Sequence, residues 1–319
     1  MSVSVPGLHH VTAIAGDPQR NAEFYVRLLG LRLVKYTVNH DDPETPHLYY
    51  GDRRGTPGTN MTFFGWSADR KRGQFGAGQT AYNAFAIAPN SLDFWRNRLR
   101  EREIPFDEVQ RFQETALRIE DPDGIGIELV ADPGAELLSI EPWETGPVEA
   151  RHQLRGFHNI TLKVADTDST EAVLSEVMNY ERVGRDGDRL RLQSHGAGPA
   201  SMVDLVETDA VRGQIGIGSV HHVAFNVENP DKQQELRAAL EDFGLEPTDV
   251  YDRLYFKSIY CREPGGVLFE FATDAPGFTA DQHLDDLGAE LVLPDELEEQ
   301  RTQIEAELPD FDPTPFADS

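Results

Sequence analysis

The 319-residue sequence has a single cysteine, Cys261, and very few lysines. One thiol excludes a disulfide framework and a metal cluster held by several thiolates. Five of the 29 basic residues are lysines, and 56 acidic residues give a formal net charge of −27. A negative field of this size repels nucleic acids and anionic membranes, so neither is an expected partner.

Long apolar runs are also missing. No segment approaches the roughly 20 apolar residues that span a bilayer, and no basic stretch precedes an apolar one at the N-terminus. We therefore expect a soluble, cytoplasmic protein. Hydrophobic residues still make up 39% of the chain, enough for ordinary cores. An acidic, lysine-poor surface over such cores indicates adaptation to a very salty cytoplasm, where salt screens the self-repulsion of the chain.

A repeated pattern of one strand, one helix and three strands, here called a module, accounts for most of the chain. The first module opens with an apolar strand at 8–15, and Asp17-Pro18 then signals the start of a helix that ends at Gly30. Strands are expected near 32–38, 47–50 and 60–65.

The same pattern begins again near residues 82, 157 and 220, and the fourth helix has a clear start at Asn229-Pro230. The fold class predicted from it is α+β, with four βαβββ modules paired into two domains that have curved mixed sheets. The domain limits are 1–135 for modules 1 and 2, 136–154 for a linker, and 155–275 for modules 3 and 4. Residues 276–319 form an acidic extension, expected to be a solvated segment over the body, with an active-site lid as the alternative.

Two His-His pairs, His9-His10 and His221-His222, begin equivalent strands of modules 1 and 4. Because consecutive strand residues point to opposite faces, one histidine of each pair is expected to face the sheet interior, and the other to face away or to pack beside it. Aligned on their first strands, the modules place four residues at one position: His10, Tyr82, Asn159 and His222. Aligned on their last strands, they place four others at a second position: Phe63, Glu128, Asp204 and Glu270.

Modules 1 and 4 together thus offer two imidazoles and one carboxylate, the ligand set of an open non-haem metal site. We predict that His10, His222 and Glu270 bind a metal ion. Phe63 cannot bind a metal, and its neighbour Thr62 is a poor substitute, so positions stay free for a substrate and O₂. His9 either packs or contacts the substrate. No role is assigned to five other histidines: His40, His47, His152, His195 and His283.

The four modules, the strands at 8–12 and 220–224, and the turn and strand at 265–270 resemble the vicinal-oxygen-chelate superfamily. This superfamily includes glyoxalase I, bleomycin-resistance proteins and type I extradiol dioxygenases. The sequence is most similar to ring-cleaving dioxygenases that open hydroquinones. The resemblance implies Fe(II), or alternatively Mn(II), as the cofactor, a small aromatic substrate and O₂. A homo-oligomer is left open.

The resemblance also implies four catalytic residues around the metal: His9, Thr12, Arg253 and Tyr260. Tyr260 is then expected to hydrogen-bond or exchange a proton with bound oxygens, and His9 to take a phenolic proton. Arg253 is expected to stabilise an anionic intermediate or product.

Two other functions stay open. A lyase or isomerase of the glyoxalase type normally has four protein ligands for Ni or Zn, and Phe63 argues against it. A metal-free binding protein of the bleomycin-resistance type does not need His10, His222 and Glu270 together.

Overall fold

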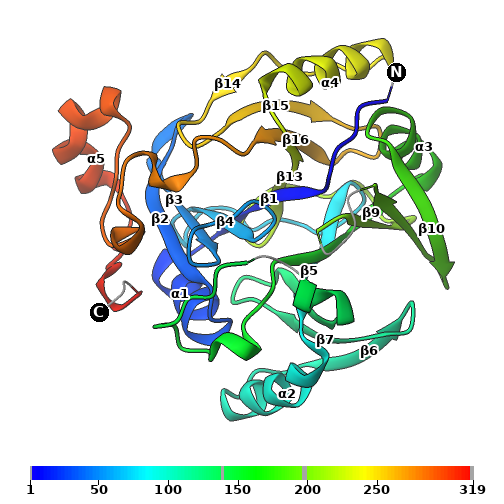
Figure 1. Cartoon of the computed structure of the whole chain (residues 1–319). Coiled ribbons are helices and arrows are strands. Elements are labelled where there is room, and N and C mark those ends of the chain that lie inside the picture. The colour runs from blue at the N-terminus through cyan, green and yellow to red at the C-terminus, as the bar shows by residue number, and fades with distance from the viewer. Residues whose placement is uncertain (1, 138–139, 196–199, 317–319) are drawn as a thin grey trace.

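The computed structural model describes residues 2–137, 140–195 and 200–316. In it, the strands form two eight-stranded curved sheets, with the main helices on their outer sides (Figure 1). The fold class predicted from the sequence is confirmed.

The elements follow the expected modules. Module 1 comprises β1 (Leu8–Ala15), α1 (Pro18–Ala22), η1 (Glu23–Leu28), β2 (Arg32–Asn39), β3 (Asp42–Gly51) and β4 (Asn60–Gly65). Module 2 comprises β5 (Gln79–Ile87), η2 (Pro89–Ser91), α2 (Leu92–Glu101), β6 (Asp107–Arg111), β7 (Glu114–Glu120) and β8 (Gly126–Ala131). Module 3 comprises β9 (Phe157–Val164), α3 (Thr167–Ala172), η5 (Val173–Val177), β10 (Tyr180–Asp186), β11 (Arg189–Ser194) and β12 (Met202–Glu207). Module 4 comprises β13 (Val220–Val227), α4 (Pro230–Asp242), β14 (Tyr251–Asp252), β15 (Lys257–Arg262) and β16 (Leu268–Thr273).

Short helical turns occupy the remaining segments. Between modules 2 and 3 these are η3 (Pro133–Leu137) and η4 (Ala150–His152). After module 4 they are η6 (Phe278–Ala280), η7 (Leu284–Asp286), η8 (Asp295–Gln300), α5 (Arg301–Glu307) and η9 (Thr314–Phe316).

The helix starts expected from the sequence are confirmed by their capping bonds. The Asp17 carboxylate accepts from the backbone N–H of Arg20, and the Asn229 side-chain oxygen accepts from that of Lys232. These bonds satisfy backbone donors that have no partner within the first turn.

The sheets join modules that are far apart in the chain. One sheet has the order β14-β15-β16-β13-β1-β4-β3-β2 and combines modules 1 and 4; we call it the outer sheet. The other has the order β10-β11-β12-β9-β5-β8-β7-β6 and combines modules 2 and 3; we call it the inner sheet. This pairing differs from the expected grouping of consecutive modules in 1–135 and 155–275. The domain limits themselves stay a prediction.

The segment expected as a linker, 136–154, packs against the body where it is described, since Trp143 and Val148 are buried. Residues 138–139 of this segment lie outside the described residues.

The C-terminal extension lies over the body, as expected from the sequence, but part of it is buried there rather than solvated. Phe278 and Leu287 are buried against the outer sheet, and the Lys35 ammonium in β2 binds Asp281 at 2.6 Å. Residues 317–319, the end of the predicted extension, lie outside the described residues.

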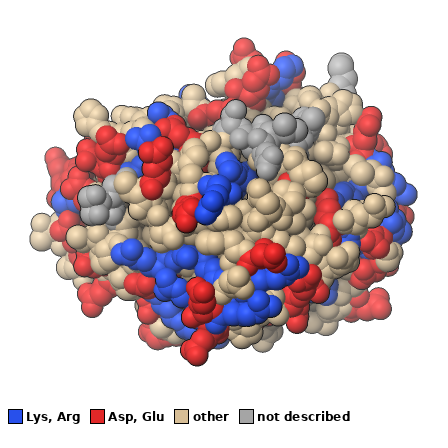
Figure 2. All heavy atoms as spheres, turned by 60° about the horizontal axis from the view of Figure 1, so that its bottom comes forward, with Lys and Arg blue, Asp and Glu red and all other residues tan. Residues whose placement is uncertain are grey.

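Acidic side chains are spread over the face shown in Figure 2, while basic side chains gather along its lower part. Among the described residues, no helix is long and apolar enough to cross a membrane.

Candidate metal centre

The two His-His strands lie side by side at the centre of the outer sheet. β1 and β13 are antiparallel, with Val11 opposite Val223. On either side of this pair, His10 lies opposite Ala224 and His222 lies opposite Thr12. Because residues two apart share a face of a strand, His10 and His222 face the same side of the sheet.

β16 brings the carboxylate to this face. It runs parallel to β13 with Glu270 opposite Ala224, so Glu270 and His10 lie in one cross-strand row. The turn before β16 places Gly266 at φ +99°, a left-handed conformation that glycine adopts without steric cost. Residues 10, 222 and 270 thus meet although they come from the first and last modules.

The three predicted ligands converge on one point. Nε2 of His222 lies 2.8 Å from Oε2 of Glu270, and Nε2 of His10 lies 3.4 Å from the same oxygen. The two Nε2 atoms are 3.4 Å apart. Atoms on one face of an octahedron with metal bonds of about 2.1 Å are separated by about 3.0 Å. The spacing therefore suits three ligands of one divalent ion, and among the described residues these three form the one such cluster.

The electrostatics of the cluster also favour a cation. Oε2 of Glu270 is buried and, among the residues that the structure describes, has no hydrogen-bond donor apart from the two imidazoles. Burial alone would raise the pKa of Glu270, but the charges and hydrogen bonds of His10 and His222 hold this pKa well below its usual value. Burial lowers the pKa of His222, which favours its neutral, metal-binding form. Ser258 donates a hydrogen bond to Oε1 of Glu270, which leaves Oε2 for the metal.

Two β-bulges place the neighbouring histidines beside the ligands. His9 is the extra residue of β1 between the pairs Leu8–Phe225 and His10–Ala224, and His221 is the matching extra residue of β13. In each pair the two Nδ1 atoms lie 2.8 Å apart. Of the two expected placements of the second histidine, facing away or packing beside the first, the structure shows the second, because a bulge interrupts the alternation of faces. When Nε2 of a ligand histidine binds metal, its Nδ1–H donates to the neighbouring Nδ1.

The strand register shows that the match of Phe63 with Glu270, expected from the sequence, is wrong by one residue. In module 4 Glu270 lies opposite Ala224, and in module 1 Thr62 lies opposite Thr12, the residue equivalent to Ala224. Thr62, and not Phe63, is therefore the counterpart of Glu270. Phe63 faces the core, where its ring lies 4.6 Å from that of Tyr25. The Thr62 hydroxyl bonds Thr12 at 2.8 Å and His47 at 2.9 Å.

A cavity of about 320 Å³ opens over the three ligands. It is lined by His10, Asn39, His40, Asp41, His47, Tyr49, Phe64, His221, His222, Thr248, Arg253, Phe256, Tyr260, Leu268 and Glu270. Aromatic walls and a few polar groups are typical of a small-molecule site.

Two of the four predicted catalytic residues line this cavity. Tyr260 lies opposite Glu270 on β15, and Arg253 contacts its hydroxyl with Nε at 3.3 Å. Burial and the Glu270 carboxylate raise the pKa of Tyr260 well above its usual value, so the phenol keeps its proton and can donate it in a hydrogen bond.

The other two, His9 and Thr12, lie behind the cavity wall. Burial and the neighbouring His10 lower the pKa of His9 to about 3, so its ring is neutral. Thr12 reaches the site through Thr62.

The sequence reasoning missed several wall residues: His40, Asp41, His47, Tyr49, Phe64 and Phe256. His47 and Tyr49 could have been found from the alternation of β3, because Tyr49 pairs with Thr62 and His47 with Phe64 on the next strand. Burial lowers the pKa of His47 well below its usual value, so its ring is neutral beside the ligands.

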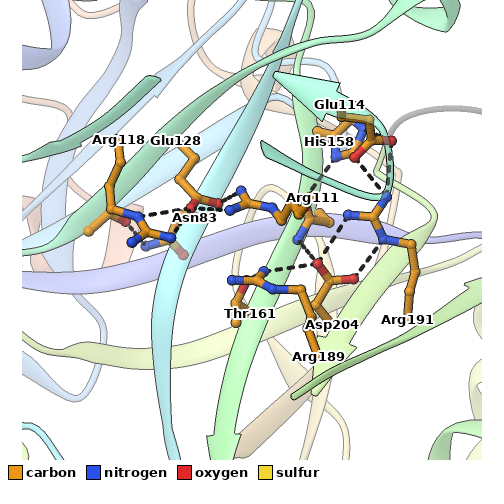
Figure 3. Close-up of polar contacts among 12 residues, drawn as sticks. Asn83, Arg111, Glu114, Arg118, Glu128, His158, Thr161, Arg189, Arg191 and Asp204 are labelled. Atoms are coloured by element: carbon orange, nitrogen blue, oxygen red, sulfur yellow. Dashed lines mark hydrogen bonds and ion pairs between the residues drawn. The ribbon is translucent and has the colours of Figure 1, made fainter. Parts of the chain in front are cut away.

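The inner sheet also carries acids at the positions equivalent to Glu270, but arginine side chains form ion pairs with these acids (Figure 3). Arg111 donates to both oxygens of Glu128, and Arg118 donates to Oε1 at 3.1 Å. Asp204 receives bonds from Arg189 at 2.9 Å and from Arg191 at 2.8 Å.

These ion pairs suit a structural role for the inner acids. A carboxylate that accepts paired guanidinium bonds has few lone pairs left for a metal, and the arginines repel a cation. Burial is the main cause that lowers the pKa of Arg111 to about 9, and repulsion from the Arg189 charge is the next largest. The inner sheet therefore lacks the donor set that its partner sheet presents.

Comparisons with known proteins agree with this geometry. Residues 7–129 match the model of the Glyoxalase/Bleomycin resistance protein/Dioxygenase superfamily. A Bacillus subtilis (strain 168) protein, provisionally named ring-cleaving dioxygenase MhqO, is 40% identical over 312 residues, 98% of each chain. The chlorohydroquinone/hydroquinone 1,2-dioxygenase of Sphingobium indicum is 35% identical over 310 residues, 94% of this chain and 95% of that one.

A solved structure also matches almost throughout. The crystal structure of a B. subtilis protein, provisionally described as a dioxygenase, superposes with a TM-score of 0.93 and 39% identity. The match covers 98% of this chain and 99% of that chain. The resemblance expected from the sequence is thus confirmed, and the chain belongs to the glyoxalase/bleomycin resistance protein/dioxygenase superfamily, among relatives that are named ring-cleaving dioxygenases.

Proposed function

We propose that this protein is a metal-dependent dioxygenase that opens a hydroquinone-type ring with O₂, with a catechol-type ring as the alternative. The ligands are His10, His222 and Glu270, and the ion is Fe(II) or alternatively Mn(II). The observation that carries the proposal is an open three-ligand cluster under an aromatic cavity. A relative of 35% identity is named a hydroquinone dioxygenase, which supports this choice of ring.

Thr62 separates this proposal from a lyase or isomerase of the glyoxalase type. The position equivalent to Glu270 holds a threonine whose hydroxyl already bonds Thr12 and His47. A fourth protein ligand is therefore lacking among the described residues of the cluster. Three ligands leave coordination positions for a substrate oxygen and O₂.

When bound, the ion would acidify a ring hydroxyl and pass electrons from the ring to O₂. The chain positions the reactants. The aromatic walls formed by Tyr49, Phe64 and Phe256 hold the ring and exclude water. Tyr260, which stays protonated, donates a hydrogen bond to a hydroxyl oxygen of the substrate ring or to an oxygen atom that comes from O₂. Arg253 stabilises negative charge that develops in the same part of the cavity.

His9 and Thr12 are proposed to act through other residues. His9 lies outside the cavity lining and contacts Nδ1 of His10, so it positions this ligand and fixes the tautomer that binds metal. Its low pKa does not support a role in taking a phenolic proton. Thr12 orients the Thr62 hydroxyl.

The test is metal analysis of anaerobically purified protein, followed by O₂ uptake with hydroquinone and with catechol. We expect one iron or manganese ion per chain and one O₂ consumed for each ring opened. Tight Ni or Zn with turnover of a thiol adduct would instead establish a lyase or isomerase. Ring binding without metal and without O₂ uptake would establish a binding protein.

A further inference from the structure

An arginine–aspartate pair joins modules 1 and 4 at the mouth of the cavity. Arg253 follows β14, and its guanidinium lies over the rings of Tyr260 and Tyr251 at 5.4 and 5.0 Å from their centroids. Asp41 lies in the hairpin between β2 and β3. Its carboxylate accepts from Nη1 and Nη2 of Arg253 at 3.3 and 3.0 Å.

All three guanidinium nitrogens of Arg253 have a hydrogen-bond partner. Nε contacts the Tyr260 hydroxyl, and both terminal nitrogens face Asp41. The Arg253 side chain is 15% exposed, whereas that of Asp41 is 71% exposed. Among the described residues that line the cavity, Arg253 is the one lysine or arginine. A carboxylate on a bound ring therefore has no other side-chain cation to meet.

Two further acids, Glu296 and Asp252, act on His40 in the cavity wall. Burial and Arg253 lower the pKa of His40, while three carboxylates oppose this change: Glu296, Asp41 and Asp252. These groups add negative potential where a substrate enters, and a second negative charge on the ring is repelled there.

We propose that Asp41 is a specificity-determining residue that makes the site select uncharged dihydroxybenzenes and reject rings with a carboxylate substituent. This inference rests on the proposed function. A divalent ion and Arg253, opposed by Glu270 and Asp41, leave one net positive charge, which one ring phenolate neutralises. A carboxylated ring brings a second negative charge that this balance does not accommodate, and such a mismatch is an effective means of discrimination.

The test uses Asp41→Asn, which keeps the size and an acceptor oxygen but removes the charge. The two probes are hydroquinone and gentisate, which is hydroquinone with one carboxylate. We expect the ratio of kcat/KM for gentisate to that for hydroquinone to rise at least tenfold in the variant. Asp42→Asn, on the same hairpin but bonded to Thr45 and outside the cavity lining, is the matched control and should leave the ratio unchanged.

A second variant tests whether the effect passes through the guanidinium. When Asp41→Asn is combined with Arg253→Gln, the ratio of kcat/KM for gentisate to that for hydroquinone should lose the increase that Asp41→Asn alone produces. Anaerobic calorimetry with the iron-loaded proteins measures the same selectivity without turnover. A binding ratio and a kcat/KM ratio that both stay within twofold of the parent protein would overturn the role of Asp41, while hydroquinone consumption leaves the proposed function intact. Absence of O₂ uptake by the parent protein refutes the proposed function, and the binding ratio still decides the role of Asp41.

Discussion

Few residues separate the proposed metal-binding face of the outer sheet from its counterpart in the inner sheet. Both faces derive from the same strand pattern, and both carry a carboxylate opposite the first strand of a module: Glu270 in one, Glu128 in the other. Two histidines accompany Glu270, whereas arginines bind Glu128. The chemistry of each site therefore depends on the neighbours of the acid.

Substitutions at these acids should separate metal binding from stability. We expect Glu270→Gln or His222→Ala to remove most of the bound iron, because each deletes one of three ligands. Glu128→Gln should leave the iron content unchanged. It should lower the free energy of unfolding by about 3 kcal/mol, since buried Arg111 loses its charged partner. Metal analysis after dialysis against a chelator and urea unfolding measure the two effects. Iron lost from Glu128→Gln and kept by Glu270→Gln would refute the assignment of the site.

At the level of elements, one contact links the helix of module 1 to a turn of module 2. The Tyr25 hydroxyl in η1 donates to Oδ2 of Asp121, in the turn between β7 and β8, at 3.2 Å. Oδ1 of Asp121 accepts from the backbone N–H groups of Asp123 and Ile125. Burial nevertheless raises the pKa of Asp121 to about 6.

This buried carboxyl should make stability depend on pH. Between about pH 4 and pH 6 the folded state holds a proton on Asp121 that the unfolded state has released. The free energy of unfolding therefore falls as pH rises through this range, by up to about 3 kcal/mol. Asp121→Asn should lack this contribution, so its stability relative to the parent protein should rise over the same range.

Urea unfolding of both proteins between pH 4.0 and 6.5 measures the difference, with Asp107→Asn, an exposed acid on β6, as the control. Parallel profiles for the parent and Asp121→Asn would show that the Asp121 carboxyl is not perturbed in this way.

Most elements could be predicted because their signals are local. Asp17-Pro18 and Asn229-Pro230 mark helix starts through their own capping bonds, and apolar runs mark the strands. The bulges at His9 and His221 could not be predicted, because they depend on how β1 and β13 pair. For the same reason the match of Phe63 with Glu270 is wrong by one residue. Position in a sheet is set by the partner strand, and Thr62 faces the site only once β4 pairs with β1.

For the whole molecule, local sequence signals could not predict which modules pair to form a sheet. All four modules share one pattern, so each first strand offers a similar edge. The sequence nevertheless pointed to the three side chains that the structure brings together, because histidines occur at this position in modules 1 and 4 alone. Asp41 was missed because it lies in a hairpin whose orientation follows from the sheet as a whole, whereas the alternation of β3 could have indicated His47.

The charge of the whole chain should make its stability depend strongly on salt. Acidic groups dominate, with a net charge of −27, and their repulsion is screened as the Debye length falls from about 10 Å at 0.1 M salt to about 3 Å at 1 M. We expect the Tm to rise by several degrees between 0.1 and 1 M KCl. Calorimetry measures the shift, and sorbitol at equal osmolality is the control. A Tm that is constant or falls with KCl would refute adaptation to high salt.

The pairing of the first module with the fourth and of the second with the third has a consequence for biosynthesis. Modules 2 and 3, which form the inner sheet, can pair during synthesis before module 4 has been made, whereas module 1 must remain unpaired until then. His10 is made 260 residues before Glu270, a delay of roughly 10 to 50 s at ordinary translation rates. The nascent polypeptide therefore cannot complete the proposed metal site before Glu270 has been made, which is after all four modules but the end of the last strand have been translated.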